Sequence, residues 1–260
     1  MKLGFIGAGN MAGAIIKGFI NKNCVNSSDI YFIRQNKEKQ AQQAKELGIN
    51  GCDDYDSLIE NSDILFLGVK PVVFPTLLPQ IAKSVKKKNP LVVSMAAGLT
   101  TDSIREMLGY DAKIIRIMPN VNAAIAMSTT AVCKNEFASD EDLATIKNLF
   151  STIGLTTEVP ENQFAIFTAI AGCSPAYVYM FIDGLARGAQ KMGMNKQKAL
   201  EIAASAVIGS ASMYAQSNEH PQELVDKVCS PGGTTIEGVT TLEEYKFTAG
   251  VVKAVENSIL

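Results

Sequence analysis

Short apolar runs alternate with longer amphipathic segments along the first 158 residues of the chain. The runs KLGFI, DIYFIR, DILFLGV, PLVVSM and KIIRIM have the length of strands and are rich in β-branched and aromatic residues. They are apolar on both faces, as expected for a parallel sheet that helices cover on both sides. The alternation predicts an α/β domain over residues 1–158, a Rossmann-type doubly wound parallel sheet.

Beyond about residue 160 only helical patterns follow. Ser174 and Pro175 predict one helix start, as N-cap and first helical residue, and Asn195 predicts the cap of the next helix. That second helix is apolar on every face from Ile202 to Ala211, so it must be buried. About 100 residues are too few to bury it within one chain. We therefore expect an all-α C-terminal dimerisation domain over residues 159–260 that pairs in a homodimer.

The composition narrows the function classes. The formal net charge of −2 argues against a nucleic-acid surface, and five isolated cysteines without a CxxC predict neither a metal site nor a disulfide framework. No signal peptide or uninterrupted membrane-spanning run is recognised, so we expect a cytoplasmic protein that does not enter the membrane. Because His220 is the one histidine, the difficult chemistry is expected to come from a cofactor.

The first turn, GAGNMAG, has the spacing of a dinucleotide-binding motif. Gly7 permits a tight turn, Gly9 lets backbone amides approach a pyrophosphate, and Ala12 allows the helix to pack closely on the strand. The pyrophosphate would lie at the N-terminus of the following helix, where free N–H groups favour anions. A tight turn without a ligand is the alternative interpretation.

The end of the next strand distinguishes the two nicotinamide dinucleotides. An NAD site usually has an acid there for the ribose hydroxyl, but the sequence runs Ile33-Arg34-Gln35-Asn36-Lys37 before Glu38. Arginine and lysine attract a 2′-phosphate, so NADP(H) is favoured and NAD(H) remains possible; an ordinary solvated position is the alternative for Lys37. The cofactor residues predicted from both turns are Ile6, Gly7, Ala8, Gly9, Asn10, Met11, Arg34, Gln35, Asn36 and Lys37.

Two further turns follow strands whose carboxyl ends meet the same edge of the predicted sheet. One contains Val69, Lys70 and Pro71, and the other contains Ala96, Ala97 and Gly98. Ligands of open parallel sheets bind beyond this edge. The small or rigid residues of both turns suit a flat ring, so we assign them to the cofactor site.

A second glycine turn stands late in the chain, in the segment SPGGTT. Thr234 and Glu237 have the spacing of a capping box, with Thr234 as N-cap and Glu237 as the third helical residue. The turn Pro231-Gly232-Gly233 then leads into a helix N-terminus, a geometry that binds small anions such as a carboxylate. The alternative is a tight connection between helices.

Six segments together resemble the pyrroline-5-carboxylate reductase family: FIGAGNMA (5–12), GVKP (68–71), SMAAG (94–98), RIMPN (116–120), AGCSPAYVYMFID (171–183) and CSPGGTTIEG (229–238). The resemblance covers essentially the whole chain. It implies NAD(P)H-dependent reduction of the C=N bond of 1-pyrroline-5-carboxylate to L-proline, the last step of proline biosynthesis. It also places the turns at 69–71 and 96–98 against the nicotinamide, and Asn120 joins the cofactor site.

The same resemblance assigns the substrate site and the assembly. The implied substrate-binding residues are Ser230, Gly232, Gly233, Thr234, Thr235, Glu161 and Lys227. Thr235 is the predicted catalytic residue because its counterpart lies closest to the ring nitrogen. The family is dimeric through its helical halves, and some members assemble further. One departure follows RIMPN, where the family commonly has T-P-A and a glycine pair but this chain has VNAAIAMS, including Ala126.

Two other functions remain as alternatives. A β-hydroxyacid or keto-acid reductase of the same architecture typically uses a buried lysine in its helical half, whereas Lys191 and Lys196 stand at predicted helix ends. A non-catalytic NADP-binding regulatory paralogue would not need a carboxylate site. The intact SPGGTT segment therefore favours the reductase.

Overall fold

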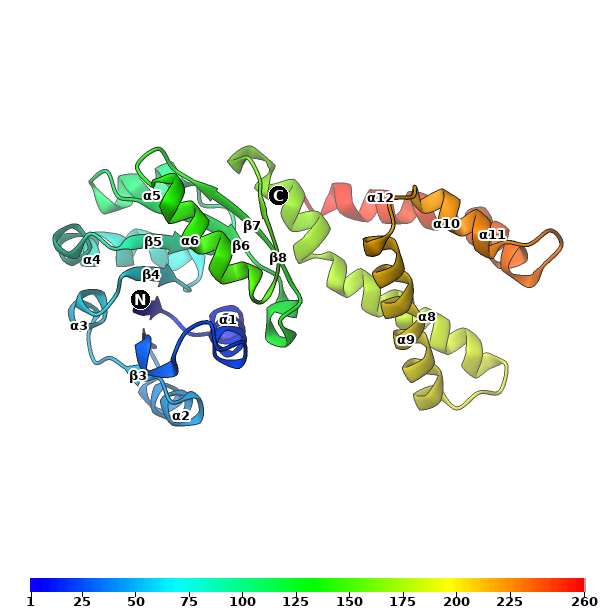
Figure 1. The fold of residues 1–260 in the computed structure, drawn as a ribbon, viewed down its shortest axis with the longest axis horizontal. Helices are drawn as coiled ribbons and strands as arrows, with labels where there is room; N and C mark the ends of the chain where they lie inside the picture. The colour runs from blue at the N-terminus through cyan, green and yellow to red at the C-terminus, as the bar shows by residue number, and fades with distance from the viewer. Residues whose placement is uncertain (260) are drawn as a thin grey trace. The chain divides into compact units, whose positions relative to one another are not determined.

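The computed structural model describes residues 1–259, which form two compact units, Met1–Gly172 and Cys173–Ile259 (Figure 1). The predicted domain boundary at 158/159 falls at the end of the last strand, and the first compact unit continues to Gly172. The strands are β1 Leu3–Ile6, β2 Ile30–Ile33, β3 Asn50–Gly51, β4 Ile64–Leu67, β5 Leu91–Ser94, β6 Ile114–Met118, β7 Ser128–Lys134 and β8 Gly154–Glu158.

The strands form one sheet in the order β3-β2-β1-β4-β5-β6-β7-β8. All neighbouring strands are parallel except β6 and β7, which pair antiparallel. The five predicted runs are β1, β2, β4, β5 and β6, so the Rossmann-type prediction is confirmed. The sequence pattern missed β3, which has two residues, and the threonine-containing strands β7 and β8.

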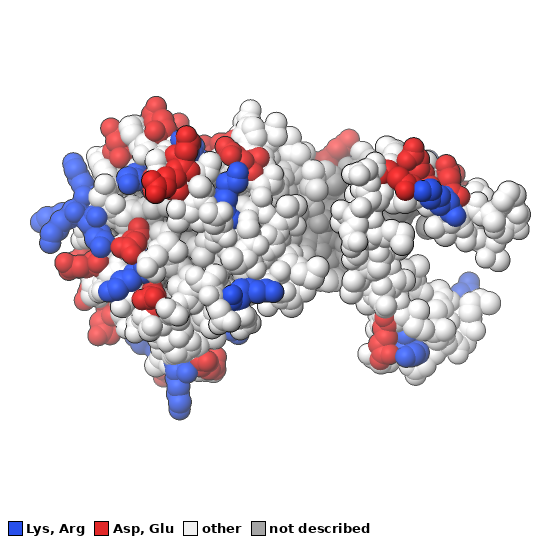
Figure 2. All heavy atoms as spheres, viewed as in Figure 1, with Lys and Arg blue, Asp and Glu red and all other residues white. Residues whose placement is uncertain are grey.

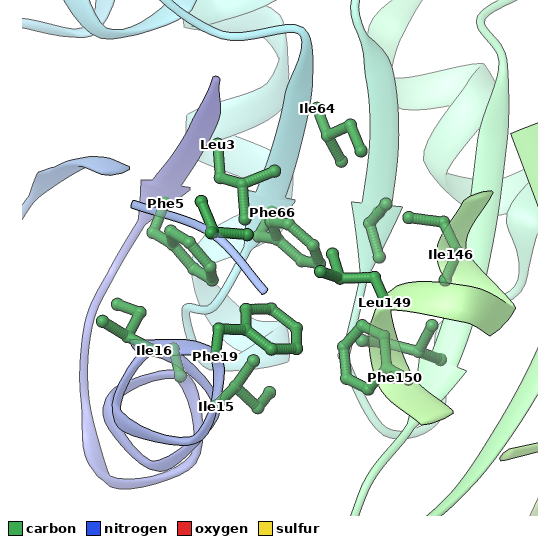
Figure 3. Close-up of a cluster of buried hydrophobic side chains, with 14 of the residues drawn as sticks. Leu3, Phe5, Ile15, Ile16, Phe19, Ile64, Phe66, Ile146, Leu149 and Phe150 are labelled. Atoms are coloured by element: carbon green, nitrogen blue, oxygen red, sulfur yellow. The ribbon is translucent and has the colours of Figure 1, made fainter. Parts of the chain in front are cut away.

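Helices cover both faces of this sheet. They are α1 Asn10–Asn21, α2 Lys37–Leu47, α3 Tyr55–Glu60, α4 Phe74–Lys88, α5 Thr101–Leu108, α6 Asp140–Ser151 and α7 Phe164–Phe167. Apolar side chains of α1 and α6 pack on one face, and those of α3, α4 and α5 on the other. Figure 3 shows the first cluster, in which Phe5 stacks on Phe66 with ring centroids 4.5 Å apart. Burial of apolar side chains such as these is the dominant favourable term in folding.

The reversal at β7 determines where the chain leaves the first unit. The connection between β6 and β7 contains the short helix η3, Val121–Ile125, and ends at Ala126 with φ +57°. After β8, α7 leads into a π-helical turn, η5 Thr168–Gly172. The buried side chain of Asn120, just beyond β6, donates from Nδ2 to the Ala171 carbonyl at 3.0 Å and accepts at Oδ1 from the Thr129 amide. The first unit therefore ends beside the carboxyl edge of its parallel strands.

The second unit contains only helices, as predicted. They are α8 Ser174–Lys191, α9 Lys196–Gln216, α10 Pro221–Val228, α11 Thr234–Glu244 and α12 Phe247–Asn257. Asn195 caps α9, with its side chain accepting from the Lys198 amide, as expected. The N-cap of α8 is Cys173 rather than Ser174, which is its first residue. The π-helical turn runs directly into α8, so no side-chain cap is needed there.

Most side chains of the second unit are exposed in the single chain. Helices α10, α11 and α12 contain no buried residue, and α9 buries only Ala199 and Ala203. By length and composition, the helical stretch Glu161–Lys191, which contains an 18-residue window with a mean hydropathy of 1.6, could cross a membrane. Those two properties do not distinguish a membrane span from a helix that packs against another protein chain.

Candidate functional site

The first turn of the chain is in backbone contact with the end of β4. Gly7 has φ +86°, and a Cβ atom there would lie 2.8 Å from the Gly68 carbonyl oxygen. A Cβ at Gly68 would lie only 2.5 Å from the Gly7 oxygen. Because any side chain at either position would collide with backbone, two glycines are required here. The tight turn predicted at Gly7 is confirmed.

The N-terminus of α1 is open beside this turn. Gly9 is its N-cap, makes no side-chain cap, and has no atom within 4 Å of the position a Cβ would take. The amides of Asn10, Met11 and Ala12 are in the first helical turn, where helices leave N–H groups without internal partners. A dinucleotide pyrophosphate fits this arrangement, because amides and helix dipole favour an anion and no side chain fills the space.

A groove of about 460 Å³ continues from this helix start toward α2. Its lining includes Gly9, Asn10, Lys17, Arg34, Lys39 and Gln43. Within the described chain, none of these three cations forms an ion pair. Their charges therefore remain available to an anionic ligand.

Arg34 is held in this groove by side chains of α2. Its main-chain amide donates to Gln40 Oε1 at 2.7 Å, and its Nη1 donates to Gln43 Oε1 at 2.7 Å. Gln40 is itself buried and donates to the Cys52 carbonyl. Two further cations that line the groove, Lys17 and Lys39, were missed by the sequence interpretation. Lys39 and Gln43 are four residues apart on one helix face, which is the pattern that could have identified them.

The other residues predicted around this strand end have different positions. Lys37 Nζ donates to the Asp53 carbonyl at 3.1 Å and to the Cys52 carbonyl at 3.3 Å. The Asn36 side chain caps α2 by accepting from the Lys39 amide, and Gln35 is exposed. Lys37 and Asn36 therefore engage backbone groups of their own unit, whereas Arg34 lines the groove.

The two turns assigned to the nicotinamide lie at the carboxyl ends of β4, which neighbours β1, and of β5, which is the next strand beyond it. Val69 lies against Gly7, with its Cγ1 2.8 Å from where a Cβ of Gly7 would be, and Pro71 begins the short helix η2, Pro71–Val73. Ala96 is buried, whereas Gly98 has φ +77° and no atom within 4 Å of its Cβ position. The structure thus brings both turns and the first glycine turn to one edge of the sheet.

Glu161 lies in a charged cluster of the first unit. Its Oε1 accepts from the Thr101 amide at 2.8 Å and pairs with Arg116 Nη1 at 3.3 Å, and its Oε2 accepts from the Thr101 hydroxyl at 3.0 Å. Arg116 is buried and lies over the Phe164 ring, 4.6 Å from its centroid. Burial, reinforced by the negative charge of Glu161, raises the pKa of the nearby Cys133 thiol to about 12. Thr101 begins α5, so Glu161 ties that helix start to β6.

The SPGGTT segment of the second unit forms a tight turn between α10 and α11. The Gly233 amide donates to the Ser230 carbonyl at 3.0 Å, and Gly232 has φ +67°, as expected when proline and glycine occupy the turn centre. The predicted capping box is wrong: Gly233 is the N-cap, Thr234 is the first helical residue, and no side chain caps α11. Gly233, the last residue of the turn, has the extended backbone of an N-cap, so Thr234 is the first residue of the helix.

Because the N-cap is Gly233 and not Thr234, no side chain covers the N-terminus of α11. Ser230, Gly232, Thr234 and Thr235 are exposed, and the first amides of α11 lack side-chain partners. An anion can therefore reach both the amides and the hydroxyls. Lys227, at the end of α10, forms an ion pair with Glu219.

A Rossmann-type unit with an amide-rich first turn and a cationic groove, followed by a helical unit, defines a dinucleotide-dependent oxidoreductase. Residues 161–260 match the model for pyrroline-5-carboxylate reductase dimerisation, and residues 2–98 match that for NADP oxidoreductase, coenzyme F420-dependent. Pyrroline-5-carboxylate reductase of Escherichia coli (strain K12) is 41% identical over 97% of this chain and 94% of its own length. The chain belongs to the pyrroline-5-carboxylate reductase family.

Further relatives agree with this assignment. Pyrroline-5-carboxylate reductase 2 of Bacillus subtilis (strain 168) is 34% identical over 99% of this chain and 92% of its own. The crystal structure of the Streptococcus pyogenes reductase is 38% identical, with a TM-score of 0.90 over 100% of this chain and 96% of that one. The Plasmodium falciparum enzyme with NADP bound is 29% identical, also with a TM-score of 0.90, over 100% and 95%. The family resemblance of the motifs is confirmed.

Proposed function

We propose that this protein reduces the C=N bond of 1-pyrroline-5-carboxylate to give L-proline, with NADP(H) preferred over NAD(H). Relatives named for this activity match nearly the whole chain. The observation that carries the proposal is the open start of α11 behind Ser230–Gly233, an anion site of its own in addition to the dinucleotide turn. A purely nucleotide-binding protein has no use for it.

The reaction needs positioning more than strong acid–base catalysis. When bound, NAD(P)H would supply the hydride that reduces the imine carbon. A protonated cyclic imine is already electrophilic at that carbon, so the chain's task is to hold the ring in place. The amides of Gly232 and Thr234 and the Ser230 hydroxyl hold the substrate carboxylate, and the Thr235 hydroxyl hydrogen-bonds to the ring nitrogen. Gly233 belongs to the substrate site as the residue that closes the turn, with its amide bonded to the Ser230 carbonyl. Glu161 and Lys227 complete the proposed substrate set.

The proposed cofactor site follows the carboxyl edge of the sheet. The first turn of α1 would hold the pyrophosphate, and Arg34 and Lys39, which line the groove, would contact the 2′-phosphate. The turns at 69–71 and 96–98 border the nicotinamide, and Asn120 supports that edge through its bond to Ala171. The absence of an acid between Ile33 and Lys37 favours NADP(H).

We further propose a homodimer formed by the second unit, with assembly of dimers as an open extension. Most large exposed apolar side chains of the chain belong to this unit, including Ile208 at 64% and Met213 at 68% exposure. On the face shown in Figure 2, charged side chains crowd the first unit and are sparse on the helices of the second. Pairing with a second copy removes this surface from water. We place the dimer in the cytoplasm, away from membranes and nucleic acids.

The deciding experiment is a spectrophotometric assay of the purified protein with NADPH and with NADH. Loss of absorbance that depends on pyrroline-5-carboxylate, and faster with NADPH, is expected. Binding of NADPH without turnover would overturn the enzyme proposal and support a regulatory protein. Turnover of a β-keto acid in place of the imine would support the other reductase class.

A further inference from the structure

The cationic groove contains one contact that a general dinucleotide site does not require, between Arg34 and Gln43. We propose that Gln43 positions the Arg34 guanidinium for the 2′-phosphate and thereby determines the preference for NADP(H) over NAD(H). This inference rests on the proposed function insofar as it takes NADP(H) to be the preferred cofactor. It concerns a residue outside the glycine turn and outside the strand end that carries Arg34.

Arg34 is fixed at both ends by glutamines of α2. Gln40 Oε1 accepts a hydrogen bond from the Arg34 main-chain amide, and Gln43 Oε1 accepts one from Arg34 Nη1, each at 2.7 Å. A guanidinium has five N–H groups, so one bond to Gln43 orients the plane and leaves the others for a second acceptor. A planar fork held in this way is suited to bidentate binding of phosphate oxygens.

The proposed role of Gln43 requires an uncharged side chain as well as the right geometry. A glutamate at this position would form an ion pair with Arg34 and cancel its charge, whereas the amide accepts the same hydrogen bond and leaves the charge intact. The one acid that lines the groove, Glu46, accepts from Gln42 Nε2 at 2.7 Å. Among residues 1–259, Lys17, Arg34 and Lys39 form no ion pair, so the groove stays positive.

Gln43 is also held from the side of α1. Its Nε2 lies 3.5 Å from the position that a Cβ of Gly13 would take, so the amide packs directly over the backbone of the pyrophosphate-binding helix. Gln43 is half-buried there. It thus connects the helix that binds the pyrophosphate to the arginine that faces the ribose, and its side chain has little freedom to leave Arg34.

The test measures binding by calorimetry, with adenosine 2′,5′-bisphosphate and AMP as probes, which differ only in the 2′-phosphate. Wild-type protein is expected to bind the 2′-phosphorylated probe at least about tenfold more tightly than AMP. Gln43→Glu should lower this ratio by about 30-fold, because the new carboxylate pairs with Arg34 and repels phosphate. Gln43→Met keeps the length but loses the acceptor, and should lower the ratio by about fivefold. Affinity for AMP should change by less than about threefold in both.

Ala41→Glu is the matched control, since it adds the same charge to an exposed position of α2 that does not line the groove. Its ratio should stay within about twofold of wild type. An unchanged ratio in both Gln43 variants overturns the inference, and so does an equal loss for both probes, which indicates a merely structural role. If wild-type protein does not distinguish the probes, the NADP(H) preference fails instead. The NADPH-to-NADH ratio of kcat/KM should follow the binding ratio.

Discussion

Thr235 is the residue on which the proposed chemistry depends most directly. It is exposed in the first turn of α11, beside the open amides. Thr235→Ala should lower kcat/KM for pyrroline-5-carboxylate by about 10- to 100-fold through loss of one hydrogen bond at the reacting ring. The dissociation constant for NADPH should change by less than about twofold, measured by fluorescence titration.

Thr240→Ala is the control on the same helix. The Thr240 hydroxyl donates to the Ile236 carbonyl and is exposed, so its loss should leave kcat/KM nearly unchanged. A Thr235→Ala protein with wild-type kcat/KM, or with equal losses for substrate and cofactor, would show that the hydroxyl lies away from the ring nitrogen.

Ala126 is a residue in a backbone conformation that favours glycine. Its φ of +57° costs a non-glycine residue about 1–2 kcal/mol, which is more than the conformational entropy that glycine loses on folding. Ala126→Gly should therefore raise the free energy of unfolding by about 0.5–1 kcal/mol, measured by urea denaturation. Ala124→Gly, in the helical turn η3 just before it, should lower that free energy instead. A loss of stability in Ala126→Gly would contradict the argument.

Cys133 and Tyr110 should make stability fall at high pH. Burial raises the pKa of both side chains to about 12, against ordinary values of about 8.5 and 10. The unfolded chain loses the Cys133 proton above about pH 8.5 and the Tyr110 proton above about pH 10, whereas the folded chain keeps both. Each contribution to stability is therefore full below the unfolded pKa and disappears as pH approaches 12. Between pH 8 and 10.5, Cys133→Ala should lose about 2–3 kcal/mol less than wild type in denaturation experiments, and Tyr110→Phe about 1 kcal/mol less.

At the scale of elements, the link between Glu161 and the start of α5 should stabilise the fold. Glu161→Gln leaves the Arg116 guanidinium, 7% exposed, without a counter-charge, and should lower the free energy of unfolding by about 1–3 kcal/mol. Glu158→Gln is the control, since its pair with Lys147 is exposed and is worth less than about 1 kcal/mol. Equal effects of the two substitutions would contradict this role.

The same Glu161→Gln protein tests the substrate assignment. Both carboxylate oxygens already accept hydrogen bonds from Thr101. If Glu161 also contacts the substrate, KM for pyrroline-5-carboxylate should rise at a temperature where the variant is fully folded. A lowered stability with an unchanged KM would assign Glu161 to the fold alone.

Elements with strong local patterns could be predicted from the sequence, and those that depend on backbone context could not. Strands β1, β2, β4, β5 and β6 are buried on both faces and read as apolar runs. β7 and β8 contain threonines and a glycine, so neither has the continuous apolar run by which the other five strands were recognised. The T-x-x-E spacing at 234–237 has the pattern of a capping box, yet the backbone of Gly233 takes the N-cap position.

The residues of the candidate site that belong to local motifs could also be predicted from the sequence, and those that depend on distant contacts could not. Gly7, Gly9 and Arg34 lie where their motif predicted, because a glycine turn and a strand end have short-range causes. Whether Lys37 or Lys39 faces the groove depends on the direction of each side chain on α2. Lys37 donates to the carbonyls of Cys52 and Asp53, which lie 15 and 16 residues further along the chain, so the sequence around Lys37 does not predict these bonds.

At the scale of the whole molecule, the second unit should be stable only as part of an oligomer. Size-exclusion chromatography with light scattering should give at least twice the 27.9 kDa mass of the chain, and Tm should rise with protein concentration. Ile208→Asp, at an exposed apolar position of α9, should dissociate the oligomer and lower Tm. Gln197→Asp, at the polar start of that helix, should do neither. A monomeric wild-type protein would refute the pairing.

The antiparallel β7 has a consequence for how such proteins diversify. Because the chain turns back at β7, it departs from the first unit next to Asn120, on the margin where hydride chemistry takes place in this fold. Any helical module grafted after Gly172 begins at that margin, whatever its sequence. The entry point of such a module is therefore set by the direction of one strand and not by the residues that follow Gly172.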